Sequence, residues 1–231
     1  MAPPSQEVLL ICLIGGVVAS DTTAAFQVLI SHPLVACTLA GLVLHDVPMG
    51  LTIGILLELL WLAEVPVGGV RVSEGNVGAL VSASVAIWLG RASNRPDVQL
   101  FAAVAWGVMV AVIGGSVVTG CRRANVLLLH RADAAAARGD VAGVATCHVV
   151  AMALSFAAGA LLTAVATVVG LWLLSKAIAV VPASWDGAFG FTRAMLIGAG
   201  VGAVCMLLLS RRNVWAATAG LGAGLLYLYL A

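Results

Sequence analysis

Five polar side chains in the first third of the chain are of the kinds that bind hydroxyl groups. Carboxylates accept hydrogen bonds from two hydroxyls at once, while amide and imidazole groups both donate and accept. This set suits a neutral polyhydroxyl ligand such as a sugar, and its carboxylates would equally suit a cation pathway. Residue types alone do not separate these two ligands. The residues that we predict to bind substrate are His32, Asp46, Glu58, Glu74 and Asn76.

Glu58 is the strongest of these candidates because it lies in the apolar sequence LLELLW. An ionisable residue at the centre of a membrane helix costs ~2.5–3.5 kcal/mol on insertion scales, and by default it marks a functional site. The structural alternative is a carboxyl that pairs with an arginine or is buried neutral between helices. The adjacent Trp61, or Trp88, would cover the apolar face of a sugar. Glu64 precedes Pro66 near a predicted helix end, and it fits a lining position and an interfacial position equally well.

The sequence offers no set of residues for catalysis, for a metal or for a cofactor. The histidines lack a metal-binding spacing such as His-x-x-x-His, and neither Gly-x-Ser-x-Gly nor a glycine-rich loop ending in Lys-Ser/Thr is present. Gly198, Gly200 and Ala203 formally match a dinucleotide fingerprint, but no strand is predicted before them, so we interpret them as small residues at helix contacts. The five cysteines lack C-x-x-C spacing and are predicted to pack as small apolar side chains.

The composition predicts a membrane protein. Of the 231 residues, 62% are hydrophobic and 9% are charged, against about 25% charged in soluble domains. The mean hydropathy of +1.14 requires a surface that faces lipid, so we predict a multi-pass protein of the cell (inner) membrane. A net charge of +1 provides no basic surface for nucleic acid. Residues 1–6 contain no Lys or Arg, so a cleaved signal peptide is not expected.

Uncharged stretches in the second part of the chain are long enough to cross a bilayer, which needs about 17 residues or more of helix. These uncharged stretches are residues 98–121, 141–175, 194–210 and 213–231. The stretch at 141–175 is longer than a bilayer requires, so we predict one helix there whose membrane span covers residues 148–175.

The N-terminal third, residues 7–90, has a different pattern. Its apolar pieces, residues 8–20, 34–44, 49–62 and 77–90, are too short to cross a bilayer singly, and Gly and Pro interrupt them. Irregular backbone at membrane depth is tolerated only where protein or a watery cavity surrounds it. We therefore predict an all-α membrane protein with broken or re-entrant helices around a polar site, as in many transporters.

Residues 121–147 form the most polar segment, and they are predicted to lie in the cytoplasm by the positive-inside rule. The Ala-rich run at 132–137 favours helix, Gly139 is placed to end it, and Asp140 is placed to cap the next helix. With the 98–120 span and the C-terminal spans at 148–231, this segment completes one membrane domain over residues 1–231. The charged residues of the segment are Arg122, Arg123, Arg131, Asp133, Arg138 and Asp140.

Three runs carry a family resemblance: HPLVACTLAGLVLHD at 32–46, GLTIGILLEL at 50–59 and PVGG at 66–69. They resemble the IIC subunit of the mannose/fructose/sorbose family of sugar phosphotransferase systems, which shows RPLVA-x-x-L-x-G-x-x-L-G-D, G-x-x-I-G-x-x-L-E and (I/V)-G-(A/G). The segment from LHRAD at 129–133 through Asp140 and His148 is also similar. The similarity covers most of the chain.

This resemblance implies an oligomeric complex in the lipid bilayer with a IID membrane subunit. It also implies soluble IIA and IIB phosphocarriers, of which IIB donates phosphate from its own histidine to the transported hexose. The subunit itself would supply recognition and movement rather than catalysis. Glu58 and Asp46 would lie in or next to the sugar site, with the loop after Gly69 at its mouth.

Three positions depart from the family pattern. Ser73-Glu74 stands where the family has Pro-Asp, His45 replaces a glycine, and the acidic residue upstream of the first run is Phe26 or Gln27 here. These changes affect the expected substrate more than the fold. They keep open a sugar-sensing or regulatory subunit that does not transport. An unrelated cation channel or carrier is the third alternative.

Overall fold

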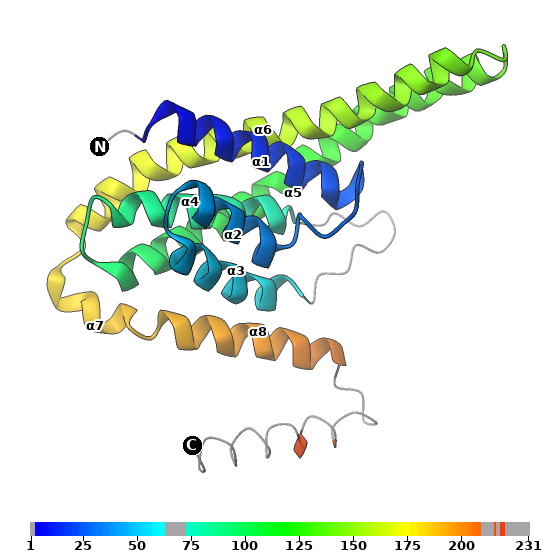
Figure 1. Ribbon diagram of the computed structural model, residues 1–231. Helices are drawn as coiled ribbons and strands as arrows, with labels where there is room; N and C mark the ends of the chain where they lie inside the picture. Colours follow the sequence, from blue (N-terminus) through cyan, green and yellow to red (C-terminus); the bar gives the residue numbers. More distant parts are fainter. Residues whose placement is uncertain (1–2, 63–72, 209–214, 216–217, 220–231) are drawn as a thin grey trace.

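The computed structural model describes residues 3–62, 73–208, 215, 218 and 219, and these contain helices and no strand. The all-α prediction is therefore confirmed. Figure 1 shows the arrangement of the helices, whose bounds are α1 Ser5–Thr23, α2 Pro33–Val43, α3 Val47–Trp61, α4 Gly75–Gly90, α5 Pro96–Ala136, α6 Val141–Val180, η1 Ala183–Trp185, α7 Asp186–Phe189 and α8 Thr192–Leu208.

The predicted breaks in the N-terminal third are present as three short apolar helices. Helices α2, α3 and α4 contain 11, 15 and 16 residues, less than the roughly 20 that a membrane span requires. Proline lies in the first turn of both α2 and α3, where its missing N–H costs no helical hydrogen bond. These helices therefore start and stop inside the apolar part of the molecule, as the Gly and Pro pattern indicates.

Helix α1 corrects one sequence prediction. The apolar piece at residues 8–20 looked too short to cross a bilayer, but α1 has 19 residues and is long and apolar enough to do so. The helix includes Glu7 and Asp21 because both carboxylates have hydrogen-bond donors. Glu7 accepts from Trp88 and Arg91, and Asp21 accepts from backbone N–H groups of the following loop. Dividing the sequence at formal charges therefore underestimated the length of this helix.

Helices α5 and α6 form a long antiparallel hairpin that extends well beyond the other helices (Figure 1). They contain 41 and 40 residues, so each is about 60 Å long at 1.5 Å per residue, twice the ~30 Å of a hydrocarbon core. The turn matches its prediction, because Gly139 has a φ of +69° and the Asp140 carboxylate caps α6 by accepting from the N–H of Gly143. Residues 141–180 form one helix, as expected.

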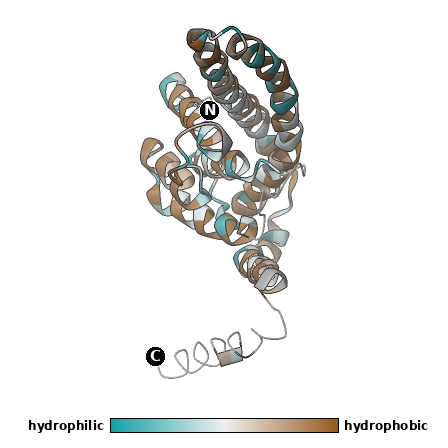
Figure 2. Ribbon diagram, turned by 90° about the vertical axis from the view of Figure 1, so that its right-hand side faces the viewer, coloured by the Kyte–Doolittle hydropathy of each residue, from teal (hydrophilic) through white to brown (hydrophobic). Residues whose placement is uncertain are grey.

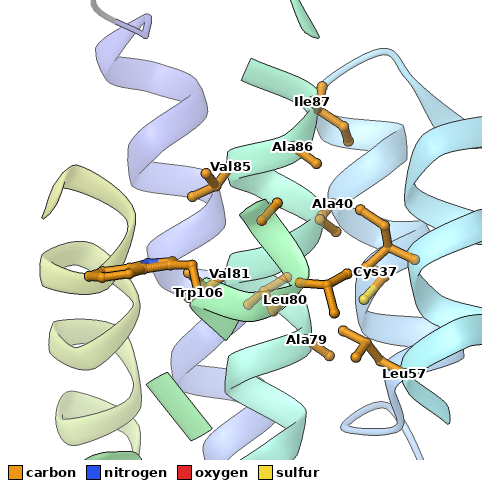
Figure 3. Close-up of a cluster of buried hydrophobic side chains, with 14 of the residues drawn as sticks. Cys37, Ala40, Leu57, Ala79, Leu80, Val81, Val85, Ala86, Ile87 and Trp106 are labelled. Atoms are coloured by element: carbon orange, nitrogen blue, oxygen red, sulfur yellow. The ribbon is translucent and has the colours of Figure 1, made fainter. Parts of the chain in front are cut away.

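Helix α4 lies at the centre of the molecule and is buried along nearly its whole length. It contacts α1, α2, α3, α5 and α6. Figure 3 shows Leu80 and Val81 of α4 between Trp106 of α5 on one side and Cys37 and Leu57 of α2 and α3 on the other. Because protein surrounds α4 on all sides, its short length creates no conflict with lipid. This fixed helix presents residues 74 and 76 at its N-terminal end.

The outer helices carry the surface expected in lipid. Within the described part of the chain, four helical segments are long and apolar enough to cross a membrane: Ser5–Thr22, Pro96–Ala136, Val141–Val180 and Ala183–Cys205. Figure 2 shows hydrophobic residues, in brown, along the helices of the bundle, and large side chains such as Leu161 and Trp172 are exposed. The span predicted at 194–210 corresponds to α8, while the one predicted at 213–231 lies almost entirely outside the described residues.

Candidate functional site

A polar cavity of about 330 Å³ opens where α1 and α3 end, where α2 and α4 begin, and beside the middle of α5. Its volume falls at the lower end of the range for small-molecule sites, roughly 300–1,000 Å³. The residues that line it are Asp21, Thr22, Gln27, Leu29, Ser31, His32, Pro33, Glu58, Trp61, Leu62, Ser73, Glu74, Gly75, Asn76, Val118 and Arg122.

The cavity brings together four of the five residues predicted to bind substrate. His32 precedes α2, Glu58 lies in the last turn of α3, and Glu74 and Asn76 flank the first residue of α4. These positions meet because each short helix begins or ends at the same level of the molecule. The interruptions that make these helices too short to span a membrane thus also create the polar site.

Glu58 is held at the N-terminus of α2 by two hydrogen bonds. Its Oε1 lies 2.7 Å from His32 Nδ1, and its Oε2 accepts from the Leu34 N–H at 3.1 Å. The first N–H groups of a helix lack partners within the helix and carry a partial positive charge, which favours a carboxylate there. The side chains of His32 and Glu58 remain 44% and 23% exposed, so both reach the open cavity.

Two residues that line the cavity, Glu74 and Trp61, each have a buried polar atom without a hydrogen-bond partner among the described residues. The Glu74 residue is 7% exposed, and neither its Oε1 nor the Trp61 Nε1 has a partner among the described residues. Leaving such an atom unpaired costs ~1–3 kcal/mol, so native structures rarely tolerate it. The Arg122 guanidinium acts on Glu74 through its charge. The wall of the cavity thus contains a buried acceptor and a buried donor that no described residue satisfies.

Two further contacts fix the start of α4. The Asn76 Nδ2 donates to Thr22 Oγ1 at 3.1 Å, which ties α4 to the end of α1. A Cβ built on Gly75 would meet Trp61 Cδ2 at 2.7 Å, so the glycine allows the indole ring to lie directly against the helix. An aromatic ring next to carboxylate and amide groups provides an apolar face together with hydrogen-bonding partners.

Asp46 does not reach the cavity. It caps the opposite end of α3, where its Oδ1 accepts from the Met49 N–H at 3.1 Å, and twelve residues of helix, about 18 Å, separate it from Glu58. Trp88 is also elsewhere, with its Nε1 donating to Glu7. Glu64 and the predicted mouth loop after Gly69 lie outside the described residues.

Asp21 is a lining residue that the sequence prediction missed. It is 2% exposed, and its two oxygens accept from the N–H groups of Val28 and Ser31 at 2.8 and 2.9 Å. These bonds hold a loop in which Phe26 and Gln27 have φ values of +66° and +54°. Residues other than glycine rarely adopt positive φ values. The sequence signal was an acidic residue followed by two threonines at the end of an apolar run, where the division at charges placed a helix boundary.

The other polar lining residues that the prediction missed are Thr22, Gln27, Ser31, Ser73 and Arg122. Gln27 occupies one of the two positions aligned with the family's upstream acidic residue. Within the described part of the chain, no group of three or more His, Cys, Asp or Glu side chains is placed to hold a metal ion. The cavity offers carboxylates, amides, hydroxyls and one indole, which together suit a neutral polyhydroxyl molecule.

Comparison with known proteins gives a consistent picture. Residues 6–222 match the family described as "PTS system sorbose-specific iic component". A fructose permease IIC component of Bacillus subtilis (strain 168) is 32% identical over 121 residues, which cover 52% of this chain and 42% of the relative. The aligned part thus spans less than half the length of that relative.

Two solved structures share the fold. One, described as "Structure of membrane protein", has a TM-score of 0.75 at 20% identity and covers 100% of this chain and 98% of its own. The mannose transporter ManYZ in complex with microcin E492 has a TM-score of 0.63 at 20% identity, covering 97% of this chain and 88% of its own. The helical arrangement of this chain is therefore one already seen in membrane proteins.

Proposed function

Because this chain belongs to the family of sorbose-type IIC components of the phosphotransferase system, we propose that it binds a neutral hexose in the polar cavity and carries it across the cell membrane. The observation that carries the proposal is the meeting of His32, Glu58 and Glu74 at one cavity from three separate helix ends. A fructose permease and a mannose transporter are among its relatives and structural neighbours, so these two sugars are the first to test.

The lining residues make different kinds of contact with the sugar. Glu58 and Glu74 accept hydrogen bonds from hydroxyl groups, while the Asn76 amide both donates and accepts. Trp61 lines the cavity and covers one face of the sugar ring with its indole. Residues at the ends of three separate helices allow contacts with several hydroxyls at once, which is how a site distinguishes one hexose from another.

We assign the phosphoryl transfer to a soluble IIB partner and the membrane complex to a IID partner. Phosphoryl transfer relies on positive groups that stabilise the charge of the transferred phosphoryl. The described lining residues instead bring Asp21, Glu58 and Glu74 and one guanidinium, from Arg122. Such a surface suits the binding of a neutral sugar better than it suits the stabilisation of a transferred phosphoryl group. Movement and recognition are the roles that remain for this subunit.

The test is uptake of labelled mannose and fructose by vesicles that contain the complete complex, with phosphorylation of the sugar as the readout. We expect Glu58→Gln to reduce kcat/KM at least about tenfold, because a neutral amide replaces the acceptor that Glu58 presents. The matched control is Asp133→Asn, which removes the same charge from an exposed position on α5 and is expected to keep wild-type rates.

Three results would contradict the proposal. Wild-type rates for Glu58→Gln would remove this residue from the sugar site. Sugar binding without phosphorylation-coupled uptake by the complete complex would favour a sensing or regulatory subunit. Ion conductance by this chain alone, with no sugar flux, would favour a cation channel or carrier.

A further inference from the structure

The connection between α1 and α2 forms part of the wall of the polar cavity. Residues 24–32 run from the end of α1 to the start of α2 (Figure 1), and several of them line the cavity. The connection ends at His32, which together with the Leu34 N–H holds Glu58. The path of this connection therefore sets both a wall of the cavity and the position of the acid that we assign to sugar binding.

The backbone of this connection is strained at three residues. Phe26, Gln27 and Leu29 have φ values of +66°, +54° and +68°, a region in which bulky residues are outliers. The Gln27 N–H also donates to the Ala25 carbonyl at 2.9 Å, so Phe26 is the central residue of a γ-turn. The form of this turn with positive φ is rare and strained. Such a backbone path persists only where other contacts hold it in place.

The apolar side chains of the connection do not supply those contacts. Phe26, Val28 and Leu29 are 70%, 61% and 63% exposed, so they pack little against the rest of the described chain. Asp21, buried at the end of α1, contacts the connection instead. Its Oδ1 accepts from the Val28 N–H at 2.8 Å and its Oδ2 from the Ser31 N–H at 2.9 Å. Hydrogen bonds to an ionised acceptor are the stronger kind, so one carboxylate restrains the connection at two points.

We propose that Asp21 is a positioning residue of the sugar site: it holds the strained connection as a wall of the cavity, and through the start of α2 it orients His32 and Glu58. This inference rests on the proposed function, because it assigns a further residue to the same site. Each Asp21 oxygen already accepts a backbone N–H, and the side chain is buried. Asp21 therefore acts through the connection, and its effect falls on sugar affinity more than on later steps of transport.

The experiment measures Kd for mannose and for fructose in the complex of this chain with its IID partner in lipid nanodiscs. Asp21→Asn keeps the size of the side chain but replaces one acceptor oxygen with a donor amide group. We expect Kd to rise roughly three- to tenfold, and hydrogen exchange of residues 24–32 to become faster. The matched control is Glu7→Gln at the other end of α1, where the carboxylate also accepts two hydrogen bonds. Both readouts should stay near those of the wild type in this control.

Substitutions of Phe26 test whether backbone strain links Asp21 to the site. Phe26 is exposed and is not among the residues that line the cavity, so replacing it removes no lining side chain. Phe26→Gly removes the Cβ that disfavours positive φ, and it should restore most of the affinity lost in Asp21→Asn. Phe26→Ala removes the same ring but keeps the Cβ, so it should restore little.

A further variant tests the connection with Asp21 intact, so the inference stays testable even where Asp21→Asn does not fold. Phe26→Val introduces a β-branched side chain, which tolerates positive φ least. It should raise Kd about twofold or more, whereas Phe26→Gly in the same background should not. Equal affinities of these two variants would contradict the assigned strain.

The other contradicting results separate the inference from the proposed function. Wild-type affinity in Asp21→Asn would exclude its positioning role but would leave the sugar site intact. An equal rise in Kd in Glu7→Gln would show a general loss of stability in place of positioning. Rescue that is absent, or equal for Phe26→Gly and Phe26→Ala, would exclude the strained backbone as the link. Absence of sugar binding by the wild-type complex would count against the proposed function itself, and the inference would fall with it.

Discussion

His32 Nδ1 and Glu58 Oε1 lie 2.7 Å apart, which joins the residue before α2 to the last turn of α3. Helices α2 and α3 form a hairpin, and this contact closes its open end beside the polar cavity. The same carboxylate accepts from the Leu34 N–H, so its orientation is fixed by two donors from one helix start. The acid that we assign to sugar binding is therefore positioned before sugar arrives, which reduces the entropy lost on binding.

The first prediction concerns this positioning contact. His32→Ala should raise KM for sugar uptake roughly three- to tenfold while changing kcat less, since Glu58 loses one of the two donors that orient it. His32→Gln keeps a donor and should restore part of the affinity. Uptake kinetics in reconstituted vesicles measure both values. His130→Gln, on the exposed hairpin, serves as the control, and an equal effect there would show that the change is not specific to the site.

The second prediction tests the contact between Trp61 and the start of α4. Gly75→Ala should displace the indole ring, because the new Cβ would lie 2.7 Å from Trp61 Cδ2. We expect weaker sugar binding and a loss of stability of about 1–3 kcal/mol. Sugar titration and thermal unfolding measure these effects. Gly198→Ala is the matched control, because a Cβ there meets nothing within 4 Å, and similar losses in both variants would contradict the assigned role.

The third prediction concerns the end of the bundle opposite the cavity. Arg91 donates to Glu7 Oε2 at 2.7 Å and to the Leu44 carbonyl at 2.6 Å, so it ties α1, α2 and α4 together. Arg91→Ala should lower the free energy of unfolding by about 1–2 kcal/mol, because two charge-assisted hydrogen bonds are lost and the side chain is partly exposed.

Thermal unfolding of the purified complex provides the measurement. Sugar affinity should change little in Arg91→Ala, because this cluster lies away from the cavity. Arg123→Ala, at an exposed position on α5, is expected to leave the unfolding temperature near that of the wild type. A large loss of sugar affinity in Arg91→Ala without a loss of stability would contradict the structural role of this residue.

The fourth prediction concerns membrane orientation. Val118 and Arg122 belong both to the cavity wall and to the part of α5 that leads into the charged hairpin, so the cavity and residues 121–147 lie on the same side. Four arginines in this segment predict that this side is cytoplasmic. A sugar in the cavity would then be accessible to a soluble phosphocarrier.

Labelling of single cysteines tests this orientation in a chain whose five native cysteines have been replaced. A membrane-impermeant maleimide should modify Asp133→Cys only in inside-out vesicles. It should modify Gly187→Cys, at the other end of α6, only in right-side-out vesicles. The reverse pattern would place the cavity mouth outside the cell.

The sequence predicts the broken helices and most of the candidate site for a common physical reason. A carboxylate inside an apolar helix is costly unless it has a partner or a ligand, so Glu58 in LLELLW signals a polar environment. Proline and glycine interrupt the N-terminal helices at fixed positions, so residues beside these interruptions collect at the same cavity. His32, Glu74 and Asn76 follow this rule.

Asp46 and Asp21 show where the same reasoning fails. Asp46 also flanks an apolar helix, but it directly precedes the Val-Pro start of α3, where an aspartate satisfies free N–H groups as a cap. Asp21 lies at the end of α1, and its partners are the N–H groups of residues 28 and 31. Only the three-dimensional path of that loop reveals these partners. Its backbone adopts positive φ values at residues that are not glycine, and the sequence gives no sign of this.

The most direct test of the sugar site is to locate a bound sugar. Mannose carrying a small photoreactive group is cross-linked to the complete complex, and the labelled peptides are identified by mass spectrometry, with excess free mannose and fructose as competitors. The account predicts competed labelling at Trp61 and at residues 73–76, on the wall of the cavity. Competed labelling confined to the opposite end, near Asp46 and Trp88, would contradict it.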